Sequence, residues 1–116
     1  MSDIYLDRLI ALRDIGFPLA EQKEQQGKLN FGLFMSHDRT CGCLLGWWTT
    51  TSYAKADGWS FQDNIPSWHD LPTTMQSVKG YFNLEACDWL MLFRVEPEMT
   101  LADRKAHLQK LIEEFK

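Results

Sequence analysis

The sequence predicts a mainly α-helical fold, a compact single domain over residues 1–116 with four or five helices and at most one small β-hairpin. Apolar residues recur at helical spacing near both ends of the chain. Residues 84–93 form an apolar run that is longer than a typical strand. A chain of 116 residues, 45% of them hydrophobic, can bury a core without a metal or a disulfide. The alternative is an α+β fold with a larger share of strand.

The first helix is expected to follow Ser2, whose side chain can cap it. Its apolar stripe consists of Tyr5, Leu9 and Leu12. Gly16 and Pro18 are typical of helix ends, so this helix is expected to stop there. Residues 21–28 are polar and are expected to form a surface linker or a short exposed helix.

A helix is expected to start at Cys41, with Thr40 as its cap, and to continue through Trp48. Gly42 and Gly46 lie four residues apart within it and would leave a smooth groove for another segment to approach closely. Just before this helix, Leu29, Phe31 and Leu33 alternate with other residues, which favours a short strand.

A small hairpin is expected to begin near Trp59. Residues 55–58 are typical of a turn, and Trp59 and Phe61 alternate directly after it. Residues 60–72 contain Pro66 and Pro72 and are expected to form a long ordered loop with the side chains of Ile65 and Trp68 turned inward.

Residues 84–93 are expected to form the core helix, because nearly every face of it is apolar. Asn83 is the expected cap, Trp89 lies at its centre, and Pro97 ends the region.

Thr100 is expected to cap the last helix, and Asp103 three residues later completes a capping box with Asp in place of Glu. The apolar stripe of this helix consists of Leu101, Leu108, Leu111, Ile112 and Phe115. His107 is expected to be exposed to solvent.

Composition and charge exclude several classes of protein. The chain has 12 basic and 16 acidic residues, a net charge of −4, and no extended basic patch, which disfavours nucleic-acid binding. The longest strongly apolar stretch, residues 89–93, is far too short to cross a bilayer, and the first residues do not resemble a signal peptide. Three cysteines are an odd number, which favours a reduced, cytoplasmic protein over a secreted disulfide scaffold.

Two segments carry a family resemblance. Residues 43–47, Cys-Leu-Leu-Gly-Trp, and residues 80–93, which begin Gly-Tyr-Phe-Asn-Leu, resemble a pattern in small uncharacterised bacterial and phage-encoded proteins. Those proteins carry a Cys-Gly-Thr-x-x-Cys-x-x-Gly-Trp block, a Tyr-Phe-Gly-Leu-Ser segment and a closing amphipathic helix. Cys43 matches the second cysteine of that block, but Asp38 stands at the first, and Asn83 departs from the later segment. The resemblance implies a helical domain and supplies no catalytic residues.

Residues 37–48 concentrate the groups that could carry chemistry. His37, Cys41 and Cys43 are zinc-ligand types, and Cys87 or His69 would complete the set. However, Cys-x-Cys is tighter than the usual zinc spacing, so neither a metal nor any other cofactor is expected.

The thiols could instead act as nucleophiles. Cys41 or Cys43 would lie at a helix N-terminus, with His37 or the neighbours His69 and Asp70 supplying the base. No signature of a known cysteine enzyme accompanies them, so buried, inert cysteines are favoured and no catalytic residue is assigned.

The tryptophans suggest a different role. Trp48 and Trp59 each border a polar, turn-rich segment, and with Tyr53 they are the expected binding residues of an exposed aromatic surface. The sequence therefore favours a non-enzymatic protein-interaction module whose partner is another protein or a second copy of the chain. The alternative is a small thiol- or metal-dependent enzyme that uses Cys41 or Cys43.

Overall fold

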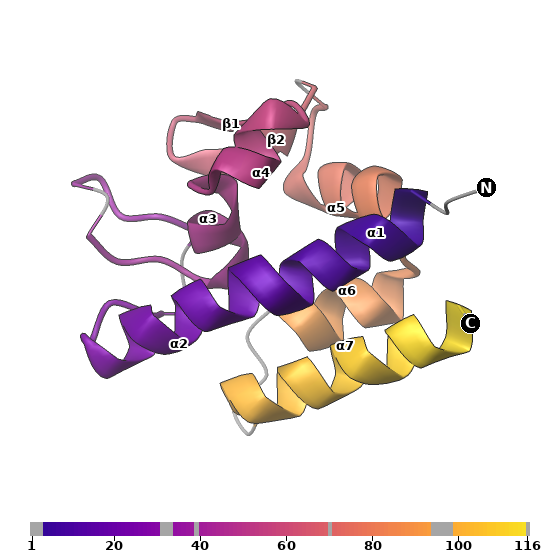
Figure 1. Ribbon diagram of the computed structural model, residues 1–116. Coiled ribbons are helices and arrows are strands. Elements are labelled where there is room, and N and C mark those ends of the chain that lie inside the picture. The colour runs from indigo at the N-terminus through magenta and orange to yellow at the C-terminus, as the bar shows by residue number, and fades with distance from the viewer. Residues whose placement is uncertain (1–3, 31–33, 39, 70, 94–98, 116) are drawn as a thin grey trace.

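The fold is mainly helical with one small β-hairpin, as predicted (Figure 1). The computed structural model describes residues 4–30, 34–38, 40–69, 71–93 and 99–115. Over these residues the chain forms more helices than the four or five expected, because the regions before and after the tryptophan pair each add a helix. The predicted roles of Ser2, Phe31, Leu33, Asp70 and Pro97 fall outside the described residues.

One long helical rod forms the first part of the chain (Figure 1). It consists of α1 (Ile4–Ala11), a π-helical turn η1 (Leu12–Gly16) and α2 (Phe17–Gln25). The prediction that Gly16 and Pro18 end the first helix is wrong. The N–H of Phe17 donates to the carbonyl of Leu12, five residues back, so the π turn carries the chain past Pro18. Pro18 then lies in the first turn of α2, where a missing N–H costs little.

The central helix is α3 (Leu44–Thr49), in which every residue is buried. It begins at Leu44 with Cys43 as the N-cap, so the prediction that Thr40 caps a helix starting at Cys41 is wrong. Thr40 instead bonds to Asp38 within a loop. The predicted close approach at the glycines is confirmed, because a Cβ on Gly46 would lie 1.8 Å from the carbonyl oxygen of Phe34. That packing encloses α3 on the side where Gly46 lies.

The predicted hairpin is present and extends further than expected. Helix α4 (Ser52–Ala56), capped by the Thr51 hydroxyl, leads into strands β1 (Trp59–Gln62) and β2 (Ile65–Trp68), which pair antiparallel. The second strand occupies part of the region predicted to be a loop, because Asp63 and Asn64 adopt the positive φ angles of a tight two-residue turn. Ile65 is exposed rather than turned inward.

Helices α5 (Thr74–Phe82) and α6 (Ala86–Phe93) follow the hairpin. Asn83 adopts a left-handed conformation at the C-terminus of α5, so its predicted role as the cap of the next helix is wrong. The prediction that the apolar segment is buried on all sides is also wrong. Trp89 is buried as expected, but its neighbour Leu90 is 44% exposed, so α6 packs on the core with one face only.

Helix α7 (Leu101–Phe115) closes the fold and begins with the predicted capping box. The Thr100 N–H donates to Asp103 at 3.0 Å, and the Asp103 N–H donates to the Thr100 hydroxyl at 3.1 Å. His107 is not exposed as predicted, because its Nε2 lies 3.0 Å from Asp88 Oδ1 on α6. Within the described ranges, no helix combines the length and the apolar character needed to cross a bilayer.

Candidate functional site

The three predicted binding residues do not form an exposed aromatic surface. Trp48 is fully buried and Trp59 is 2% exposed, and only Tyr53 is half-buried. Adjacent tryptophans on a helix point about 100° apart, so one of Trp47 and Trp48 was expected to face outward. Both are buried because neighbouring segments surround α3 on every side. The prediction that Trp48 and Trp59 offer exposed rings is therefore wrong.

The rings of Trp48 and Trp59 instead pack around Tyr81 of α5. The Tyr81 ring centre lies 5.4 Å from that of Trp59 and 5.2 Å from that of Trp68. Its hydroxyl donates to the Asp57 carboxylate, and the Arg8 guanidinium lies 4.2 Å from its ring centre. Burial, reinforced by the hydrogen bond to Asp57, raises the pKa of the Tyr81 phenol well above its usual value. This network joins the rod, the hairpin and α5, and we interpret it as structural.

The cysteines lie in three different environments. Cys43 is buried, and that burial raises the pKa of its thiol, which opposes formation of the thiolate nucleophile. Cys41 is partly buried and Cys87 is exposed on α6.

Two of the candidate histidines contact other side chains. His37 Nδ1 lies 3.4 Å from the Asn64 amide nitrogen, and the His69 ring packs against Trp68 with ring centres 4.7 Å apart. Among the residues that the structure describes, no three His, Cys, Asp or Glu side chains gather in a way that could hold a metal.

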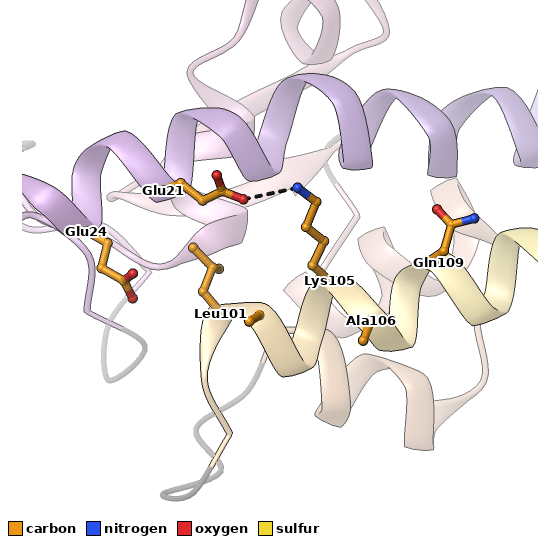
Figure 2. Close-up of a pocket in the computed structure, with 7 residues that line it drawn as sticks. Glu21, Glu24, Leu101, Lys105, Ala106 and Gln109 are labelled. Carbon is orange, nitrogen blue, oxygen red and sulfur yellow. Dashed lines mark hydrogen bonds and ion pairs between the residues drawn. The ribbon is translucent and has the colours of Figure 1, made fainter.

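A groove that can receive a ligand lies between α2 and α7, with a volume of about 520 Å³ (Figure 2). Its lining consists of Glu21, Glu24, Leu101, Ala102, Lys105, Ala106 and Gln109. Most of its surface is apolar and comes from α7, whose Ala102 and Ala106 are exposed and small. We refer to these seven residues as the α2–α7 groove.

Charged side chains border the apolar part of the groove. Lys105 Nζ lies 3.2 Å from Glu21 Oε1, and this ion pair bridges the two helices (Figure 2). Gln109 accepts a hydrogen bond from Arg13 at 3.0 Å, which fixes the end of the groove nearer to α1. The Glu24 carboxylate receives no hydrogen bond or ion pair from any described residue, and Figure 2 shows it directed towards the start of α7.

Sequence reasoning missed this groove. The spacing of Ala102 and Ala106, and of Glu21 and Glu24, already placed each pair on one helix face. Residues 21–28 were expected to be a linker or an isolated short helix, so nothing in the pattern joined them to the last helix. The two walls meet only through tertiary packing.

The resemblance to small bacterial and phage-encoded proteins stays a prediction. Comparisons of the chain with protein-family models, with curated proteins and with solved structures found no match.

Proposed function

We propose that the protein is a non-enzymatic interaction module that docks a helix of another protein in the α2–α7 groove. The observation that carries this proposal is the groove itself, an apolar surface of about 520 Å³ bordered by charged side chains. The odd number of cysteines fits a role in the reducing cytoplasm.

The shape of the groove favours a helix as the occupant. Two helices already form its walls, and an amphipathic helix buries an apolar stripe most readily against such a pair. Ala102 and Ala106 are one turn apart and small, so the backbone of a third helix can come close to α7. Charged groups at the edge, such as Lys105, suit the polar rim of an interface.

Thiol chemistry has less support. The buried Cys43 thiol, with its raised pKa, is a poor nucleophile at neutral pH. The α2–α7 groove contains no cysteine and no histidine among its lining residues, so neither thiol can act on a molecule held there.

A test of this proposal selects amphipathic helices from a displayed peptide library against the purified protein and measures their affinities by calorimetry. Replacing Ala102 and Ala106 together by Gln fills the groove without changing its charge. We expect this double variant to bind a selected helix at least about tenfold more weakly, as loss of a packed interface centre typically does.

The matched control replaces Ala56 and Ala86 by Gln. Both are exposed helical alanines that lie outside the groove, so this variant should bind like the wild type. If the selected helices bind the groove-filled protein as tightly as the control, the groove is not the docking site.

A further inference from the structure

We propose that the partner helix carries Lys or Arg along the edge that faces α2. This inference rests on the proposed function, since it names the chemistry of the partner for the same groove. The wall formed by α2 presents two carboxylates, Glu21 and Glu24, three residues apart and therefore on one face of the helix.

Of the cations near this wall that the structure describes, one pairs with Glu21 and none forms an ion pair with Glu24. Lys23 lies between the two glutamates in sequence, but its Nζ lies 4.5 Å from the Trp47 ring centre, so that its charge is directed to the other side of α2. Lys105 is paired with Glu21. Among the described residues, Glu24 therefore keeps a carboxylate that forms no ion pair.

The floor of the groove cannot supply a counter-charge for Glu24 either. Leu101, Ala102 and Ala106 are apolar, and Gln109 is neutral. A basic side chain on the partner would lie beside Glu24 while the apolar stripe covers Ala102 and Ala106. In helices that pack side by side, charged residues next to the apolar seam determine the choice of partner and its orientation. Glu24 would act in this way beside the apolar surface of Ala102 and Ala106.

The net charge of the chain, −4, also favours a basic partner. It attracts a basic segment at long range and disfavours a second copy of this acidic chain in the groove. We therefore take a basic amphipathic helix, rather than self-association, as the occupant.

The experiment uses two synthetic peptides that share the apolar stripe of a selected helix. One carries Lys at the positions flanking the stripe and the other carries Glu there. We expect the Lys peptide to bind the wild-type protein about fivefold more tightly or better at low salt, with the difference shrinking as salt is added.

Glu24→Lys should remove most of this preference. Glu114→Lys is the matched control, since it makes the same change in net charge on α7 at an exposed residue outside the groove, and it should keep the preference. If the two peptides bind equally while filling the groove with Gln at Ala102 and Ala106 still abolishes binding, the basic-partner inference is overturned and the docking function stands.

Two further outcomes would also overturn the inference. If filling the groove leaves the binding of both peptides unchanged, the docking function fails and the inference fails with it. If sedimentation shows that the wild-type protein self-associates and that the groove-filled variant does not, the occupant is a second copy of the chain.

Discussion

The guanidinium of Arg8 lies 4.2 Å from the centre of the Tyr81 ring, and its Nη1 donates to the carbonyl oxygen of Tyr81 at 2.9 Å. The same guanidinium lies 5.3 Å from the Trp68 ring centre and 3.9 Å from the Asp57 carboxylate. One side chain of α1 therefore joins the rod to both the hairpin and α5. Planar stacking and a directed hydrogen bond are properties of arginine that lysine does not reproduce.

Arg8→Lys is expected to lower the free energy of unfolding by about 1–3 kcal/mol, because it leaves a carbonyl oxygen of Tyr81 without its donor. Urea denaturation measures this cost. Arg13→Lys, on the same rod, weakens an exposed pair with Asp14 and a part-buried hydrogen bond to Gln109, and should cost under about 1 kcal/mol. Equal costs at the two positions would show that Arg8 does not hold the rod in place.

Alkaline pH should destabilise the protein through Tyr81. Its phenol is buried and donates to Asp57, so its pKa is higher in the folded state than in the unfolded chain, where tyrosine titrates near pH 10. The folded state thus holds this proton more tightly. The resulting stabilisation is fully present below about pH 10 and is lost as the pH rises further.

Urea denaturation between about pH 9 and pH 11.5 measures this loss. Above pH 10, Tyr81→Phe should depend on pH less steeply than the wild type, by up to about 1.4 kcal/mol per pH unit for one proton. Identical slopes for the two proteins would mean that Tyr81 ionises as freely in the folded state as in the unfolded chain.

Gly46→Ala is expected to destabilise the protein by about 3 kcal/mol or more, because the added Cβ would lie 1.8 Å from a backbone oxygen of Phe34, which cannot move like a flexible side chain. Thermal and chemical unfolding measure the effect. Gly80→Ala in α5 is the control, since its Cβ would meet Trp68 only at an ordinary 3.4 Å. Alanine should stabilise that helix by up to about 1 kcal/mol. A tolerated Gly46→Ala would contradict the close approach.

Helix α6 provides a test of one-sided burial with two adjacent residues. Trp89 is 5% exposed and packs on Phe93, whereas Leu90 is 44% exposed. Trp89→Ala should cost about 3–5 kcal/mol because it opens a cavity in the core. Leu90→Ala should cost under about 1 kcal/mol because little of its side chain is packed. Comparable losses for the two variants would mean that α6 is buried on both sides.

The sequence anticipated features that depend on neighbouring residues. The capping box of Thr100 and Asp103 needs only three residues of separation, and the hairpin after Trp59 needs only a tight turn. The close approach at Gly42 and Gly46 was also predicted correctly, although only Gly46 lies in α3, because a Cβ at either position would meet the carbonyl oxygen of Phe34.

Features that depend on distant segments were not predictable in this way. Pro18 ends a helix in an isolated segment, but the π turn carries the rod past it and Gly16 lets Trp48 pack against the rod. Trp59 borders a polar turn in sequence, yet Tyr81 and Phe82 of α5 cover its ring. The exposed face of α6, with Leu90 and Met91, depends on which side of the helix the rest of the fold covers, and its apolar sequence does not encode that side.

Docking in the α2–α7 groove is tested most directly by mapping the amide NMR shifts of the protein as a selected amphipathic helix is added. We predict that the largest changes fall on both walls, around Glu21 and Glu24 of α2 and around Ala102 and Ala106 of α7. Changes concentrated instead on the exposed face of α6, around Leu90, with α2 unaffected, would contradict docking in the groove.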